Sequence, residues 1–189
     1  MRAGEADHAL QLCWQLADRG HEVDVLTTKG CLNPEGANFR VHAIMPSWTW
    51  SDLPKFMRFL ARCSPDSVIL MYIGFIWNDH PMMTFAPTFS KRILPSVPFI
   101  TQFENAEGAS AHDTSPIIRY VRNAIAFCVG AKRADYRFGT LPSDNDRLIV
   151  LSSTHLAQLA KFAPGLERKS VLIPPPPLMR INPDDGGLL

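Results

Sequence analysis

The sequence predicts an α/β protein built on a mostly parallel, doubly wound sheet of the Rossmann type. Short apolar runs rich in β-branched residues alternate along the chain with stretches whose apolar residues recur at helical spacing. One run, residues 67–73, is apolar at nearly every position, which is typical of a strand covered on both faces. Right-handed crossovers between parallel strands then limit the topology to the doubly wound family.

Helices are predicted where apolar residues gather on one face. The first predicted helix ends before Gly20, because glycine adopts the left-handed conformation of a helix end at little cost. Asp52 is expected to cap the second helix and Ser152 or Ser153 the last one. Pro87 fits the first turn of a helix but not its middle. The predicted helices cover residues 5–19, 52–62, a stretch to 94 that starts or bends near Pro87, 115–130 and 154–163.

Strands are predicted between these helices, at residues 23–27, 40–45, 67–73, 99–103, 147–151 and 170–173. Four consecutive prolines from Pro174 to Pro177 end the last strand, because proline cannot donate to a strand ladder. We place one Rossmann-like domain over residues 1–178 and an interdomain linker or tail over residues 179–189.

The predicted order of strands and helices lacks the strand with which a doubly wound domain normally begins. A doubly wound domain normally opens with a buried central strand, then a Gly-rich turn and the first helix. Here residues 1–4 lead directly into the helix. We expect one further apolar strand ahead of residue 1, because two strands would otherwise lose a ladder partner. The alternative is a domain that starts with a helix.

Composition bounds the classes of function. A hydrophobic content of 46% with 20% charged residues is ordinary for a soluble globular protein, and a net charge of +1 argues against nucleic-acid binding. The four cysteines form no C-x-x-C pair and no metal-binding spacing, so we predict no metal site. No apolar run is long enough to span a membrane, and charged residues interrupt the N-terminus where a signal peptide would be apolar. We expect a cytoplasmic protein, with peripheral membrane contact left open.

Three segments resemble the N-terminal domain of the GT-B glycosyltransferases known as family 4. Residues 4–27 are similar to that family's first helix and second strand. In the family a Gly-rich loop leads into this helix, which ends in an R-G-H-E-V-like turn, here Arg19 to Val23. Pro65–Asp66 followed by an apolar strand resembles a second family element. Residues 146–177, a strand capped by serine, a helix and a proline-bearing strand end, resemble the approach to the family's interdomain crossing.

The resemblance implies the acceptor-side half of a two-domain enzyme that moves a sugar from a nucleotide-sugar donor to a glycan or other acceptor. It implies no cofactor or metal, and it implies that this half is inactive alone, because the family's E-x7-E element and donor pocket belong to the second domain. The sequence also departs from the family's T-x-H-D pattern. Phe103 stands at the position of the histidine, whereas Glu104 retains an acidic side chain at the last position.

Polar residues after two strand ends are the candidate substrate-binding and catalytic groups. Ligands of open α/β sheets bind beyond the carboxyl ends of the strands. Glu104 could orient an acceptor hydroxyl or act as its base, with Asn105 and Glu107 beside it; the alternative is a polar loop. Asn78 and His80 follow another strand end and could contact the acceptor or the donor phosphate; the alternative is helix capping next to Pro81.

Gly4 is the candidate contact for the donor phosphate. Its backbone could approach a phosphate at the start of the first helix, where the helix dipole favours an anion. A plain turn glycine is the alternative, and the neighbouring acids Glu5 and Asp7 weaken the case for an anion.

Two other functions are kept as alternatives. One is a noncatalytic sugar- or protein-binding module, which a large exposed apolar patch near Trp48 and Trp50 would support. The other is half of a nucleotide-sugar epimerase. A dinucleotide-binding site and a serine hydrolase are disfavoured, because the chain has neither G-x-G-x-x-G nor G-x-S-x-G.

Overall fold

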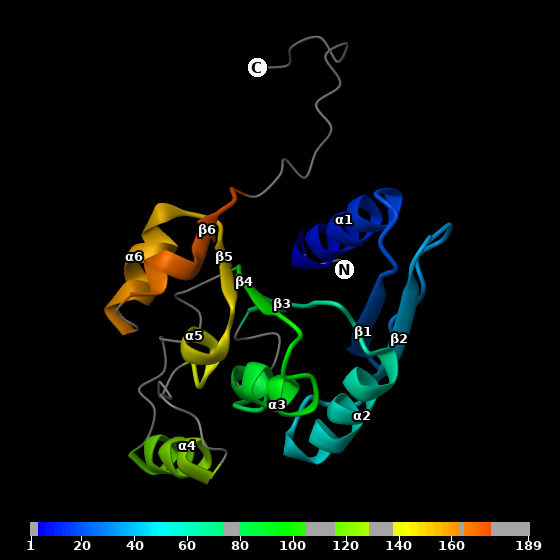
Figure 1. The fold of residues 1–189 in the computed structure, drawn as a ribbon. Helices are drawn as coiled ribbons and strands as arrows, with labels where there is room; N and C mark the ends of the chain where they lie inside the picture. Colours follow the sequence, from blue (N-terminus) through cyan, green and yellow to red (C-terminus); the bar gives the residue numbers. More distant parts are fainter. Residues whose placement is uncertain (1–3, 74–79, 105–115, 129–137, 163–164, 175–189) are drawn as a thin grey trace.

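The computed structural model has an α/β fold in which every strand pair is parallel, among the residues that it describes (Figure 1). It describes residues 4–73, 80–104, 116–128, 138–162 and 165–174. The predicted α/β class with parallel strands is therefore confirmed. The predicted tail, residues 179–189, lies outside the described residues.

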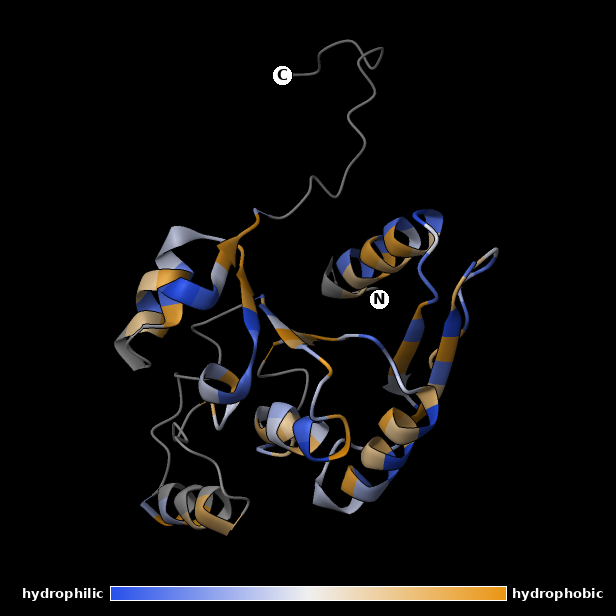
Figure 2. Ribbon diagram, in the orientation of Figure 1, coloured by the Kyte–Doolittle hydropathy of each residue, from blue (hydrophilic) through white to orange (hydrophobic). Residues whose placement is uncertain are grey.

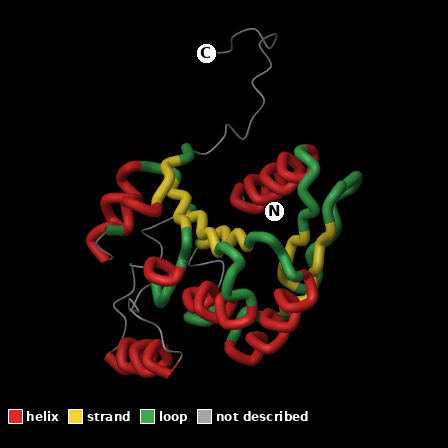
Figure 3. Tube along the Cα trace, in the orientation of Figure 1, coloured by secondary structure: helices red, strands yellow, loops and turns green. Residues whose placement is uncertain are grey.

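The strands form two sheets instead of the single predicted sheet. The smaller sheet pairs β1 (Asp24–Thr28) with β2 (Arg40–Met45). The larger sheet has the order β3-β4-β5-β6, with β3 (Val68–Tyr72), β4 (Phe99–Phe103), β5 (Arg147–Val150) and β6 (Ser170–Leu172). Figure 3 shows the strands in two separate groups. Each predicted strand is present, and its ends lie within one or two residues of the prediction.

The helices lie where the apolar stripes predict them. They are α1 (Gly4–Asp18), α2 (Leu53–Cys63), α3 (Ala86–Ile93), α4 (Pro116–Cys128) and α6 (Ser153–Phe162). Shorter pieces that the sequence does not predict are η1 (Trp50–Asp52), η3 (Met83–Phe85), α5 (Leu141–Asp144) and η4 (Leu166–Lys169). These span about one turn each, too short for a periodic pattern to reveal.

Helix ends follow from local chemistry, with one correction. Pro87 occupies the first turn of α3, and the Ser152 hydroxyl accepts a hydrogen bond from the His155 N–H at the start of α6. Asp52 is the N-cap residue of α2 as predicted, but its side chain makes no capping hydrogen bond to that helix. Its carboxylate instead accepts hydrogen bonds from the backbone N–H and hydroxyl of Ser47, at 3.0 and 2.9 Å, and holds the turn that leads into η1.

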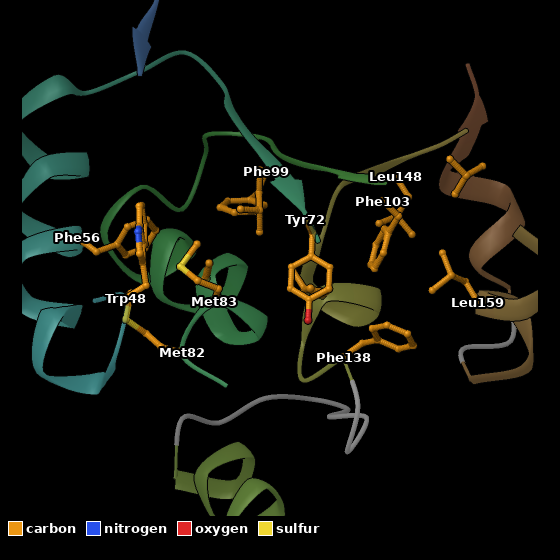
Figure 4. Close-up of a cluster of buried hydrophobic side chains, with 14 of the residues drawn as sticks. Trp48, Phe56, Tyr72, Met82, Met83, Phe99, Phe103, Phe138, Leu148 and Leu159 are labelled. Atoms are coloured by element: carbon orange, nitrogen blue, oxygen red, sulfur yellow. The ribbon is translucent and has the colours of Figure 1, made fainter. Parts of the chain in front are cut away.

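The hydrophobic core lies against one face of the larger sheet. Tyr72 and Phe103 point from β3 and β4 toward Phe138 (Figure 4). The ring centroids of Tyr72 and Phe103 are 5.5 Å apart, and those of Phe103 and Phe138 are 5.8 Å apart. Trp48 and Phe56 extend the core toward α2, and Trp48 is only 5% exposed. The buried cluster thus joins α2, α3 and the strands β3 to β5.

The opposite face of the larger sheet is less covered than the sequence predicts. Ile69 of β3 is 38% exposed, although its run was predicted to be buried on both faces. The side chains of α1 on this side are half-buried or exposed, and none of those described is buried. Figure 2 shows apolar residues along α1, β1 and β3. In the described part of the chain, no helix is long and apolar enough to cross a membrane.

Candidate functional site

A histidine and a glutamate meet at the carboxyl end of β4. His8 Nδ1 of α1 lies 3.2 Å from Glu104 Oε1, and the two side chains are only 12% and 9% exposed. The Gln102 side-chain amide donates a further hydrogen bond to the same Glu104 oxygen. The Glu104 backbone N–H donates to the Tyr72 carbonyl, which continues the ladder between β4 and β3 and fixes the residue at the strand end. A nearly buried carboxylate held in this way can accept a proton from a ligand hydroxyl.

The start of α1 belongs to the same place. Gly4 is the first residue of α1 and precedes His8 by one helical turn, so the two residues share a helix face. The contact between His8 and Glu104 therefore brings the N-terminus of α1 to the carboxyl ends of the larger sheet's strands. Sequence reasoning singles out Gly4 and Glu104 separately, and the structure brings their neighbourhoods together.

Three other candidates remain predictions. Asn78, Asn105 and Glu107 lie outside the described residues. His80 is described, half-buried, and its Nδ1 accepts a hydrogen bond from the Met82 N–H at 3.2 Å. Its ring packs edge-on against Trp50, with centroids 5.7 Å apart, at the aromatic cluster that Trp50 shares with α3.

Sequence reasoning misses His8 because nothing local marks it. In the sequence it is one polar residue in an amphipathic helix, and its partner lies far along the chain. Phe103, the residue before Glu104, is completely buried and packs against Tyr72 and Phe138. The imidazole at this strand end is that of His8 on α1.

A second charged cluster lies on the smaller sheet. Arg40 donates two hydrogen bonds to Asp24, from Nε to Oδ1 at 2.8 Å and from an Nη to Oδ2 at 2.7 Å. His42 Nε2 lies 2.7 Å from the same Oδ1. The Arg40 hydrogen bonds, more than the His42 contact, lower the pKa of Asp24 to about 2.

The same cluster contains a set of metal-ligand atoms. One ligand atom each from Asp24, His42 and Cys63 lies within 4.8 Å of the others, a donor set that would suit zinc. Both Asp24 oxygens already bind Arg40, and burial raises the pKa of the Cys63 thiol, which keeps the sulfur protonated. We interpret the cluster as an ion-pair network across β1 and β2, and we propose no metal site there.

Asp24 gives a prediction for acid stability. Because its folded pKa lies below the ordinary value, its contribution to stability is present above about pH 4 and is lost as the pH falls toward 2. We expect Asp24→Asn to lower the free energy of unfolding at pH 7 by about 1 kcal/mol, since the pair is partly screened by solvent. The difference from wild type should shrink between about pH 4 and 2 in urea unfolding curves. The matched control is Glu35→Gln at an exposed position; equal pH profiles for both variants would contradict the prediction.

Two open surface hollows lie away from the His8–Glu104 pair. One is lined by residues that include His21, Glu22 and Arg40, and the other by residues that include Lys91 and Asp146. Both are shallow and wide open, unlike a pocket that encloses a small ligand.

Comparisons with protein-family models, with curated proteins and with solved structures find no match to this chain.

Proposed function

We propose that this chain is the acceptor-side half of a two-domain glycosyltransferase of the GT-B class, and that it is inactive without the donor-side half. The observation that carries the proposal is the nearly buried Glu104, paired with His8 at the carboxyl end of β4. Carboxyl ends of parallel strands are where open α/β sheets bind ligands. The sequence resemblance supplies the class of reaction.

The pair offers the chemistry that an acceptor hydroxyl needs. A sugar hydroxyl becomes a better nucleophile when a carboxylate accepts its proton as the new bond forms. Glu104 has a second carboxylate oxygen for this task while Oε1 contacts His8 and Gln102. In the proposed role, His8 and Gln102 orient the carboxylate and the acceptor is held beside it.

The donor requires groups that the described residues do not bring together. The diphosphate leaving group needs positive charge or several N–H donors to stabilise it in the transition state. At the start of α1, the backbone N–H groups near Gly4 could supply some of this stabilisation, but Asp7 lies in the same first turns. Donor binding is therefore assigned to the second domain. The chain is accordingly expected to be inactive when that domain is absent.

The binding-module alternative loses its main support. That alternative calls for an exposed apolar patch around Trp48 and Trp50. Trp48 is 5% exposed, and its indole N–H donates to the Thr28 hydroxyl at 2.8 Å. Trp50 packs against Phe85 and Phe89 with centroids 6.0 and 6.1 Å apart. These side chains hold η1 and α3 together, which is a structural role.

The proposal predicts where an acceptor binds. We expect a panel of mono- and oligosaccharides, titrated into the chain and followed by amide NMR, to shift the signals of His8, Gln102 and Glu104. Glu104→Gln should weaken the binding by about tenfold, because it replaces a charged hydrogen-bond acceptor by a neutral one. Glu167→Gln, at an exposed position of η4, should leave binding unchanged.

The same samples test the claim that the chain is inactive alone. We expect no nucleotide release from nucleotide sugars incubated with the chain and the bound acceptor. Turnover by the chain alone would contradict the half-enzyme proposal. Sugar-induced shifts located elsewhere, or equal weakening by both substitutions, would contradict the assignment of Glu104.

A further inference from the structure

We propose that the edges of β1 and β3 form the two sides of a slot for one more parallel strand, and that this strand leads directly into α1. Filling the slot would join the two sheets into one, with the order β2-β1-new strand-β3-β4-β5-β6. The inference goes beyond the proposed function and does not depend on it, because it rests on strand pairing and burial alone. We call the space between these two edges the strand slot.

Both sides of the strand slot are strand edges. Among the described residues, β1 pairs with β2 only and β3 pairs with β4 only, and both pairings are parallel. Figure 1 shows β1 on the side of its sheet nearer to β3, with β2 outside it. One strand parallel to both edges would therefore satisfy the free N–H and C=O groups of each.

The sequence of β3 is that of a central strand. Natural edge strands carry charges, prolines or bulges that discourage pairing with other chains. The run Val68–Tyr72 has none of these. The two outer edges do: β2 contains Arg40 and His42, and Pro174 follows β6 closely. An unprotected edge at β3 indicates that the folded domain normally covers it.

Burial around the strand slot is incomplete in the way that a missing strand would leave it. On α1, the apolar stripe formed by Leu10, Cys13 and Leu16 is only half-buried, as are Val25 and Leu26 of β1. Ile69 on β3 is 38% exposed. Among the residues whose burial is described, Met45 is the first buried hydrophobic one, and those of α1 and β1 add no buried residue to the core. A strand beneath α1 would cover these side chains together.

The position of α1 decides which segment fills the strand slot. The His8–Glu104 contact holds the start of α1 at the carboxyl end of β4, and Tyr72 of β3 is paired with Phe103 of β4. A strand parallel to β3 would end at this same edge, beside the first residue of α1. From there α1 runs back and leads into β1. The new strand, α1 and β1 then form one β-α-β unit. Two parallel neighbouring strands, here the new strand and β1, require a crossover connection of this kind.

The strand must be short and apolar on both faces. Since β1 and β3 have five residues each, a partner of about five residues matches both edges. One of its faces would meet α1 and the other the core beside Trp48, so an alternating polar pattern would not suit it. A run of valine and isoleucine residues fits both requirements.

Alternation along the strands identifies the amides that face the strand slot. Val68 N–H donates to Pro98 and the Tyr72 carbonyl accepts from Glu104, so Val68, Leu70 and Tyr72 face β4. Ile69 and Met71 therefore direct their N–H groups to the strand slot. On β1, the Val23 carbonyl accepts from Arg40, so Asp24 and Leu26 face the strand slot.

The first measurement is hydrogen exchange of the chain as it is, read by amide NMR. We expect the Ile69, Met71 and Leu26 amides to exchange about tenfold faster or more than that of Leu70, which bonds to β4. If Ile69 and Met71 are as protected as Leu70, the edge of β3 is already covered and the inference is overturned.

The second measurement adds the strand. A segment of about five alternating Ile and Val residues with a short Gly-Ser loop is fused ahead of Met1, and a control carries proline at alternate strand positions. We expect the fused strand to slow exchange at Ile69, Met71 and Leu26 by about tenfold or more relative to the control. Thermal unfolding should also shift upward. Equal exchange at these amides in both fusions, or aggregation of the valine-isoleucine fusion without protection, would overturn the inference. Neither result bears on sugar binding at Glu104, so the two proposals fail separately.

Discussion

Gly139→Ala is expected to lower the free energy of unfolding by about 2–4 kcal/mol. Gly139 has a φ of +54°, where an alanine costs roughly 1 kcal/mol. A Cβ at this position would also lie 2.5 Å from Thr84 Oγ1 and 2.7 Å from the Thr84 carbonyl oxygen. Overpacking of this kind adds about 1–3 kcal/mol, because backbone has to move.

The surroundings of Gly139 leave little room for that movement. The Thr140 N–H donates to the Thr84 carbonyl at 2.9 Å, and the Thr84 hydroxyl donates to Pro81 at 2.7 Å. The Thr88 hydroxyl on α3 donates to the Asp144 carboxylate and also lies 2.6 Å from the Thr140 hydroxyl, which ties α3 to α5. Shifting Thr84 would therefore disturb a polar network that is mostly buried.

Gly165→Ala is the matched control for Gly139→Ala. Gly165 has a φ of +84°, but no atom lies within 4 Å of the position of a Cβ. Only the backbone penalty of roughly 1 kcal/mol applies there. Urea unfolding of both variants checks the prediction, and equal losses at the two positions would contradict the close contact with Thr84.

Phe103→Ala is expected to cost about 3–5 kcal/mol, a large part of the stability of a domain of this size. Phe103 is completely buried on β4 and packs edge-on against Tyr72 and Phe138 (Figure 4). Its removal would leave a cavity at the centre of the larger sheet, since β-strand neighbours on both sides limit collapse.

The control for Phe103→Ala is Phe127→Ala on α4. Phe127 is 86% exposed, so its truncation should change the free energy of unfolding by no more than about 0.5 kcal/mol. Chemical denaturation measures the free energy of unfolding of both variants. A small loss at Phe103 would mean that this part of the core is loosely packed.

Much of the fold could be predicted from local pattern. Every strand and the longer helices were predicted because side-chain periodicity and helix-end residues act within a few positions of the chain. The parallel arrangement also followed, since alternating strands and helices leave few other topologies. The one-turn pieces η1, α5 and η4 were missed because so short a segment has no period to detect.

Less of the candidate site could be predicted. Glu104 was recognisable from its place after a strand, because parallel strands direct their carboxyl ends to one edge. His8 was not recognisable, since its role depends on the distance from α1 to β4 in the folded chain. Asp52 occupies the expected N-cap position of α2, but its side-chain partner could not be predicted, for a similar reason. The turn at Ser47 competes for the same carboxylate, and that turn is visible only in three dimensions.

For this protein, the order and type of the elements and the two-faced apolar character of β3 were written in the residues themselves, because they depend on the chemistry of near neighbours. The tertiary structure alone decided that the strands divide into two sheets, with β1 and β3 each paired on one side only among the described residues. It also decided that His8 meets Glu104 and that Asp24 meets Arg40. Each of these depends on which distant segments come within contact distance, and short-range periodicity carries no record of such distances.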